Sequence, residues 1–390
     1  MKVYFDNAAT TKVRDEAIES MNRVMSTDYG NPSSMHAFGR QANTDLQNAR
    51  RDIATALGIG RNPERIFFTS GGTEANNWAI FGACEGLKRK GRHIITSVYE
   101  HSAVLDPIKK LESQGWEVTY LSPDSTGCIP KEVFSEALRE DTVFASIMLV
   151  NNETGAINPI NEFSEEIKRR DLITVLHTDA IQALCKIPVS VRSLGADLIS
   201  ISSHKLHGPK GVGALYAGAG TKLSSLILGG SQEKSSRGGT EALPAAVGFG
   251  MAVRFGITEM DETVAHVQSL RTCLSELLSK EIPEIIFINN EKSSSNHSPF
   301  IMPISLPWYN SEVLMNFLDG EDIYVSRSAA CKKGARSRSL EAMSLKNDVI
   351  DGALRISFSR YSTKEEADYF VKKLKEASVS ITKSNNKKQR

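Results

Sequence analysis

A lysine, two histidines and two hydroxyl groups follow one apolar run of the chain. The run Leu198–Ile201 is typical of a buried strand, and it leads into the sequence SSHKLHGPKG at 202–211. A lysine in such a turn is either a solvated charge or a working amine that can attack an aldehyde. The role of Lys205 therefore depends on which other groups the chain brings to the same place.

Polar residues also follow four other apolar runs. Gly71, Gly72 and Thr73 stand directly before a helix-like stretch, where free backbone amides suit a phosphate group. The other three runs lead into further polar residues: Glu100 and His101, Asn151–Gly155, and His177–Gln182. Each group alone is explained by a helix cap or a satisfied loop residue. Five groups together favour a single polar site.

Alternating strands and helices are expected to position these groups. Apolar runs predict strands at 65–69, 93–96, 143–150, 172–176, 198–201 and 213–216, with helices at 74–90 and 103–114 between some of them. The alternation predicts an α/β fold whose sheet is mostly parallel, with ligands at the carboxyl ends of the strands. After about residue 256, a helix at 262–279, a strand at 285–288 and a strand and helix within 354–377 predict a smaller α+β domain.

The overall composition argues against several classes of protein. The chain has 47 Lys and Arg against 46 Asp and Glu, a formal net charge of +1, so neither a nucleic acid nor a membrane is expected as a direct partner. No apolar run suits a signal sequence or a membrane span, which predicts a cytoplasmic protein. The five cysteines are widely spaced without a C-x-x-C pair, which argues against a disulfide framework and a metal site.

One cofactor needs all the groups at the predicted sheet edge. Pyridoxal phosphate requires a lysine for its aldehyde, an acid for its pyridine nitrogen and a cradle for its phosphate.

Eight stretches also carry a resemblance: DNAATT at 6–11, GNPSSMH at 30–36, TSGGTEANN at 69–77, NNETG at 151–155, HTDAIQ at 177–182, SHKLHGPKG at 203–211, GGSQE at 229–233 and RGGT at 237–240. In this order, over residues 3 to about 370, the chain resembles a group I cysteine desulfurase, the NifS/IscS-like branch of the fold-type I pyridoxal-phosphate enzymes.

The resemblance implies an architecture and a site. It implies a homodimer with an aminotransferase-like large domain at 15–255, a small domain from 1–14 and 256–380, and a disordered tail at 381–390. Lys205 resembles the Schiff-base lysine, Asp179 the partner of the pyridine nitrogen, Gln182 the donor to the ring hydroxyl and His101 the stacking imidazole. The implied phosphate ligands are Gly72, Thr73, Ser203, His204 and, from the other subunit, Thr240, and the implied substrate ligands are Asn31, Asn152 and Arg355.

Cys331 resembles the nucleophile that takes sulfur from the substrate. Its neighbours Arg327, Lys332, Lys333 and Arg336 favour the reactive thiolate, whereas the other cysteines lie in or beside apolar runs. The family usually reads G-S-A-C here, and this chain reads S-A-A-C. The implied function is conversion of L-cysteine to L-alanine and a persulfide on Cys331, which supplies a sulfur-acceptor protein in iron–sulfur cluster assembly or tRNA thiolation. A selenocysteine lyase, an aminotransferase, which needs no thiol, and a non-catalytic sulfur-transfer partner are the alternatives.

Overall fold

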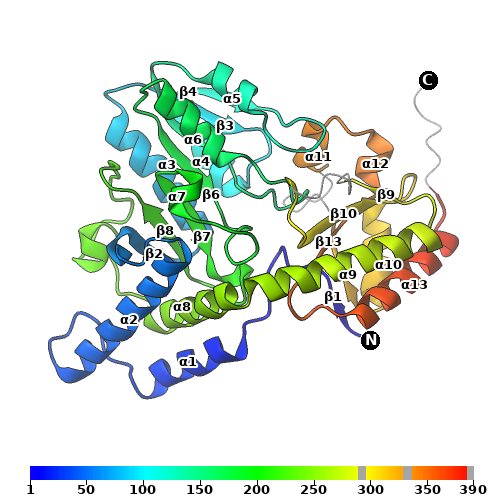
Figure 1. Ribbon diagram of the computed structural model, residues 1–390, viewed down its shortest axis with the longest axis horizontal. Helices are drawn as coiled ribbons and strands as arrows, with labels where there is room; N and C mark the ends of the chain where they lie inside the picture. The colour runs from blue at the N-terminus through cyan, green and yellow to red at the C-terminus, as the bar shows by residue number, and fades with distance from the viewer. Residues whose placement is uncertain (289–295, 328–335, 384–390) are drawn as a thin grey trace.

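A seven-stranded sheet forms the centre of the larger part of the computed structural model, which describes residues 1–288, 296–327 and 336–383 (Figure 1). In spatial order its strands are β2 (Ile66–Thr69), β8 (Gly213–Ala217), β7 (Leu198–Ser202), β6 (Val175–Asp179), β5 (Thr142–Ser146), β3 (His93–Ser97) and β4 (Glu117–Leu121). Strand β8 is antiparallel to both its neighbours, and the other pairs are parallel. Every residue of β3, β5, β6, β7 and β8 is buried, as in a sheet with both faces covered.

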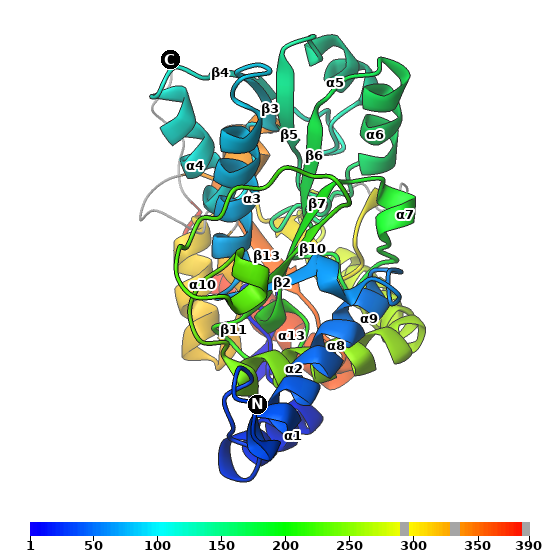
Figure 2. The ribbon, with the colours of Figure 1, turned by 90° about the vertical axis from the view of Figure 1, so that its left-hand side faces the viewer.

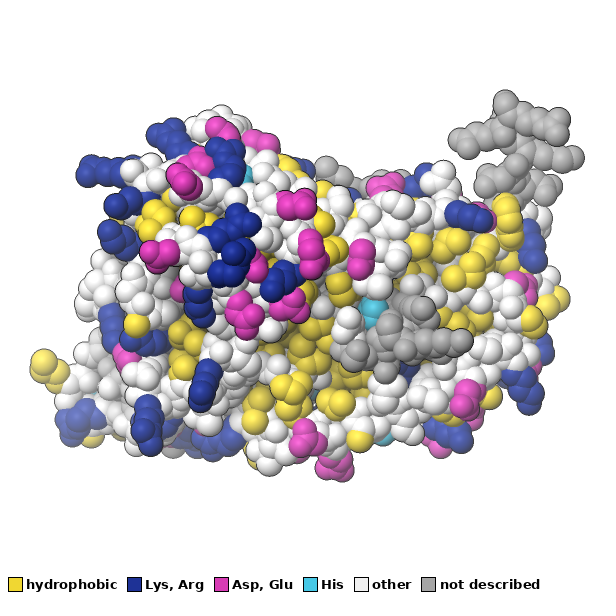
Figure 3. Space-filling view, turned by 45° about the horizontal axis from the view of Figure 1, so that its top comes forward, with side chains coloured by type: hydrophobic (Ala, Val, Ile, Leu, Met, Phe, Trp, Pro, Cys, Tyr) yellow, Lys and Arg dark blue, Asp and Glu magenta, His cyan; other side chains and the backbone are white. Residues whose placement is uncertain are grey.

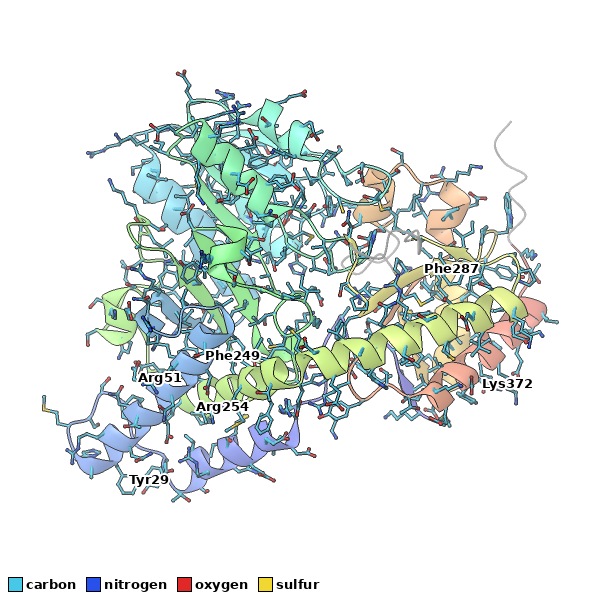
Figure 4. All side chains as sticks on the ribbon, viewed as in Figure 1. Tyr29, Arg51, Phe249, Arg254, Phe287 and Lys372 are labelled. Atoms are coloured by element: carbon cyan, nitrogen blue, oxygen red, sulfur yellow. The ribbon has the colours of Figure 1, made fainter. Side chains whose placement is uncertain are left out.

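Helices cover both faces of this sheet. On one face, α3 (Gly72–Leu87) and α4 (Ser102–Glu112) share a buried cluster with the strands, including Trp78 and Ile108. Figure 2 shows the strands between these two helices and, on the other side, α5 (Lys131–Ala137), α6 (Ile160–Arg169) and α7 (Val191–Leu194). The second buried cluster also contains residues of α2 (Ala37–Ala56) and α8 (Leu243–Thr258), against which α1 (Asp15–Ser26) packs. In Figure 4, Phe249 marks α8 beside α2.

A smaller part of the molecule has its own core and contains both ends of the described chain. Its antiparallel sheet has the order β12 (Ser326–Arg327), β13 (Ala353–Ser357), β10 (Ile301–Ser305) and β9 (Ile286–Phe287), and β1 (Val3–Tyr4) pairs in parallel with β11 (Ile323–Tyr324). Val3 and Phe5 share one buried cluster with residues of the long helices. The helices here are α9 (Met260–Glu281), α10 (Ser311–Gly320), α11 (Arg338–Ala342), α12 (Asn347–Asp351) and α13 (Lys364–Ser380).

Helices α8 and α9 adjoin at Glu259 and run from the larger part into the smaller one (Figure 1). The separate cores support the proposed division into a domain at 15–255 and a domain from 1–14 and 256–380, and these boundaries stay predictions. The predicted tail at 381–390 falls mostly outside the described residues. Within the described residues no helix is both long and apolar enough to cross a membrane. On the face shown in Figure 3, acidic and basic side chains lie among one another, in line with the balanced charge.

Two predicted strands were placed wrongly. Strand β5 ends at Ser146 rather than at 150, and β6 runs through His177 to Asp179 rather than ending at 176. The polar residues of β6 fit inside the sheet because neighbouring strands satisfy them: the His177 ring is hydrogen-bonded to the hydroxyls of Ser146 (2.8 Å) and Ser200 (2.9 Å). His177 is thus an interior residue, and only the end of its motif reaches the site.

The buried His177 makes stability depend on pH. Burial lowers the pKa of His177 to about 3, against about 6.5 in an unfolded chain. Below pH ~6.5 the unfolded chain binds a proton that the folded chain does not. The free energy of unfolding therefore decreases as the pH is lowered, by about 1.4 kcal/mol per pH unit. We expect the urea midpoint at fixed protein concentration to fall from pH 7 to pH 5, and to fall less in His177→Asn. Equal falls in the two proteins would contradict this role.

Candidate active site

A cavity of about 920 Å³ lies where the polar ends of the strands meet the smaller part of the molecule. Residues from the strand ends form one side of it, and residues of α10, β12, β13 and α11 form the other. Nine residues predicted for the site line this cavity: Gly72, Thr73, His101, Asn152, Asp179, Gln182, His204, Lys205 and Arg355. The chain therefore brings together groups that are up to 283 positions apart, since Gly72 and Arg355 line the same space.

Lys205 lies in the short turn that follows β7. Its Nζ donates hydrogen bonds to the carbonyl oxygens of Ala8 and Ala9, both at 2.7 Å. Burial lowers the pKa of Lys205 to about 8, and the nearby charge of Arg355 acts in the same direction. More of this amine is therefore neutral, and able to attack an aldehyde, than of an exposed lysine at the same pH.

Asp179 ends β6 and is buried. One carboxylate oxygen, Oδ2, accepts from Asn76 Nδ2 at 2.7 Å, and Oδ1 accepts from the Ile181 amide at 3.0 Å. Burial raises the pKa of Asp179, while the hydrogen bonds from the Ile181 amide and from Asn76 oppose that change. A protonated pyridine nitrogen would supply the missing opposite charge, so Asp179 fits the role of its partner.

The turn from β2 into α3 forms a candidate phosphate cradle. Gly71 has φ 155°, which favours glycine, and a Cβ on Gly72 would lie 2.2 Å from Ile181 Cδ1. This tight turn exposes backbone amides at the start of a 16-residue helix. Thr73 and His204 also line the cavity. Burial lowers the pKa of His204 to about 4, so its ring is neutral at pH 7.

The cavity lining favours the neighbour of the serine that was predicted for the phosphate. Ser202 lines the cavity, whereas Ser203 does not, because its Oγ lies on the other side, 2.1 Å from where a Cβ on Gly208 would stand. Ser202 is the last residue of β7, so the two adjacent side chains leave the strand in different directions. We therefore propose Ser202 in place of Ser203 as the phosphate ligand.

His101 and Gln182 have their polar atoms fixed by the surrounding chain. His101 caps α4, and its Nδ1 accepts from the Ala103 amide at 3.0 Å, which leaves Nε2 to carry the proton of the neutral ring. Gln182 Nε2 donates to Ala8 O, and its Oε1 accepts from Lys186 Nζ, both at 2.8 Å. Burial lowers the pKa of Lys186 to about 7.

Arg355 in β13 has a partly satisfied guanidinium group. Its Nη1 donates to Asn152 O and its Nη2 to Asp6 Oδ1, both at 2.9 Å. The side chain is only 3% exposed, and Nε has no partner among the described residues. A buried donor without a partner fits an anionic ligand such as a carboxylate. Asn152 contributes its main-chain carbonyl to this arrangement.

Besides Ser203, two described residues that were predicted for the site do not line this cavity. Asn31 and Thr240 are exposed and do not line it. Tyr29, which lies near Asn31 in the loop between α1 and α2, is at the end of the larger part that is remote from the smaller one (Figure 4). Cys331 lies outside the described residues. Within one chain, neither Asn31 nor Thr240 contributes to the lining of this cavity.

The prediction missed residues that support the site from behind or from the N-terminal segment. Asn76, Lys186 and Asp6 each bond a predicted residue, namely Asp179, Gln182 and Arg355. Glu100 also lines the cavity; burial raises its pKa to about 8, and its Oε2 has no partner among the described residues. Asp6, Asn76 and Glu100 stood in or beside recognised motifs, whereas Lys186 had only its position four residues after Gln182 as a signal.

The set of groups fits pyridoxal phosphate. A half-buried amine of lowered pKa, a buried carboxylate and a helix start with nearby hydroxyl and imidazole groups all face one cavity. The unpartnered Nε of Arg355 adds a place for a carboxylate beside them.

Comparisons with known proteins agree with this site. The family model for aminotransferase class-V matches residues 3–370. The cysteine desulfurase IscS of Dictyoglomus turgidum is 43% identical over 370 residues, which cover 94% of this chain and 92% of that protein. The protein of the same name from Methanosarcina thermophila is 40% identical over 368 residues, or 94% of this chain and 89% of that protein.

Solved structures show the same fold. A NifS-like protein superimposes with a TM-score of 0.92 at 38% identity, over 98% of this chain and 100% of that chain. SspA in complex with cysteine gives a TM-score of 0.79 at 32% identity, over 93% of this chain and all of that chain. The predicted fold class and family resemblance are confirmed, and the chain belongs to the aminotransferase class-V family.

Proposed function

We propose that this protein is a pyridoxal-phosphate-dependent cysteine desulfurase. The observation that carries the proposal is that Lys205, Asp179 and Arg355 line one cavity. They supply an amine and an acid for the cofactor, and a cation that can bind the substrate carboxylate. The similarity to IscS proteins over nearly the whole chain gives the reaction class. The net reaction converts L-cysteine and the Cys331 thiol to L-alanine and a Cys331 persulfide.

The residues of the chain divide the work of this reaction. When bound, pyridoxal phosphate withdraws electrons from the α-carbon of the substrate. Asp179 would keep the pyridine nitrogen protonated by its negative charge, and Gln182 would present an amide group whose orientation Lys186 fixes. Arg355 holds the carboxylate, and Lys205 Nζ is placed to carry a proton to and from carbon. His101 offers Nε2 for a second proton transfer, because Nδ1 is occupied by the Ala103 amide.

A homodimer is part of the proposal. Large apolar side chains are exposed at the end of α1, in the loop between α1 and α2, and in the loop before Gly229. They are Met25 (53%), Tyr29 (69%), Met35 (92%) and Leu228 (85%). Such exposure supports a subunit contact, and Asn31 and Thr240 lie in or near the same loops. Contact with a second subunit would bring these two residues to the partner's site. We further propose that the enzyme is located in the cytoplasm. There it would transfer sulfur to an acceptor protein of iron–sulfur cluster assembly or tRNA thiolation.

Incubation of the holoenzyme with L-cysteine tests the function. Alanine and protein-bound sulfane sulfur are expected, with alanine released in many turnovers when a thiol such as dithiothreitol removes the persulfide. An aminotransferase would instead form a 2-oxo acid and need a second oxo acid as acceptor. Selenocysteine in place of cysteine distinguishes a selenocysteine lyase by the ratio of kcat/KM values. Absence of alanine from both substrates would overturn the proposal.

A further inference from the structure

The N-terminal segment, residues 6–11 with the sequence DNAATT, is hydrogen-bonded to four side chains of the site: Gln182, His204, Lys205 and Arg355. The carbonyl of Ala8 accepts from both Gln182 and Lys205. The hydroxyl of Thr10 is hydrogen-bonded to the His204 ring at 3.2 Å. The proposed function uses these partners but assigns no role to the segment itself.

Asp6 makes the contact that bears on the substrate. A single oxygen of Asp6, Oδ1, accepts from Arg355 Nη2 at 2.9 Å and from Ser326 Oγ at 2.8 Å. Arg355 is 3% exposed and Asp6 20% exposed, so the ion pair is largely shielded from water. In such surroundings a charged hydrogen bond has a strong preference for one geometry.

The backbone fixes Asp6 against the strand that bears Arg355. Asn7 Nδ2 donates to Ser357 O at 3.0 Å, and the Ala8 amide donates to Ser357 Oγ at 2.8 Å. Residue 357 is two positions after Arg355 on β13, so one strand positions both members of the ion pair. The Asn152 carbonyl holds the other terminal nitrogen of Arg355. Two acceptors from different loops thus define the plane of the guanidinium group, while Nε is buried without a partner among the described residues.

We propose that Asp6 is a positioning residue that orients Arg355 and thereby sets the affinity of the site for the substrate carboxylate. The inference rests on the proposed role of Arg355. Without the Asp6 charge, the Nη2 side of Arg355 loses its fixed acceptor, and the guanidinium group samples other orientations. Binding of ligands with a carboxylate then weakens, while binding of amines without one does not change.

Two matched ligands separate this role from a general structural one. L-Alanine and ethylamine differ by the carboxylate alone, and neither carries sulfur, so absorbance titration of the holoenzyme measures their Kd values without turnover. We expect Asp6→Asn to weaken L-alanine roughly 10-fold, as the loss of a charged hydrogen bond predicts, with little change for ethylamine. With L-cysteine, KM should rise more than kcat falls.

Further variants make the test decisive. Ser326→Ala removes only the second donor to the same oxygen and should weaken L-alanine about 2-fold or less; it also replaces Asp6→Asn should that variant not fold. Arg355→Gln should abolish the preference for L-alanine and make an added Asp6→Asn change silent, because the two residues act through one contact. Asp322→Asn is the control, since among the described residues the Asp322 side chain bonds only the Tyr324 hydroxyl.

Equal weakening of both ligands in Asp6→Asn would overturn the proposal and make Asp6 a structural residue. Tighter binding of L-alanine would overturn it as well, because Asp6 would then compete with the substrate for Arg355. These outcomes are independent of the desulfurase assay. A protein that binds L-alanine through Arg355 but releases no alanine from cysteine would refute the proposed function alone.

Discussion

Lys205→Ala is expected to give a folded protein that has lost at least ~10³-fold of its desulfurase rate, since it removes both the amine for the cofactor aldehyde and the group that carries protons. Borohydride reduction of wild-type holoenzyme followed by peptide mapping should place the cofactor on Lys205. The variant should bind pyridoxal phosphate without a reducible link. Its fold should persist, because the two carbonyls released from Lys205, those of Ala8 and Ala9, face a cavity that water can enter.

Two other lysines are the controls for this assignment. Lys210 follows in the same turn and is exposed. Lys186 is buried with a pKa lowered to about 7, so it is also an amine of unusual reactivity, but its Nζ is bonded to Gln182 behind the cavity. Lys210→Gln and Lys186→Gln should both keep the reducible link on Lys205. A pyridoxyl group found on either control lysine would show that the assignment of Lys205 is wrong.

Cys331→Ser is expected to abolish the persulfide and to reduce alanine formation by at least ~10²-fold, while cofactor binding stays normal. Arg327 and Arg338, which lie on either side of the segment that contains this cysteine, both line the cavity. The measurement is alanine release together with trapping of sulfane sulfur on the protein. Alanine and sulfide released at the wild-type rate would contradict the role of Cys331.

The described cysteines have the opposite surroundings. Cys84, Cys128 and Cys185 are buried, and burial raises the pKa of each thiol, to about 12 for Cys185. A protonated thiol is a poor nucleophile at pH 7. Cys273 in α9 is the one described cysteine that is not buried, so Cys273→Ser is the matched control and should retain both alanine and persulfide.

Local patterns in the sequence predicted most of the larger sheet and the groups at its edge. Continuous apolar runs identified its strands because the sheet is covered on both faces, and polar residues at strand ends identified His101, Asp179 and Lys205. The same logic failed at β6, where His177 looks like a strand end. Its partners Ser146 and Ser200 lie on two neighbouring strands, and no local pattern shows that a buried imidazole will be satisfied there.

Long-range contacts account for what the sequence did not predict. The choice between Ser202 and Ser203 depends on where β7 ends, and a shift of one residue changes which side chain enters the cavity. The pairing of Asp6 with Arg355 joins positions 349 apart, and that of Lys186 with Gln182 depends on burial by the whole fold. Family resemblance supplied Arg355, which no local pattern distinguished from an ordinary strand residue, and it supplied the role of Asn152 within the polar group at 151–155.

The packing of Val3 and Phe5 against residues near the C-terminus has a consequence for biosynthesis. Asn7 and its partner Ser357 are separated by 350 positions, so at a ribosomal rate of about 5–20 residues per second roughly 20–70 s pass between their translation. During that time the β1 segment has no β11 to pair with, and its apolar side chains are available to chaperones. Asp179 and Lys205 emerge much earlier than Arg355, so the residues for the cofactor are translated before the residue that holds the carboxylate.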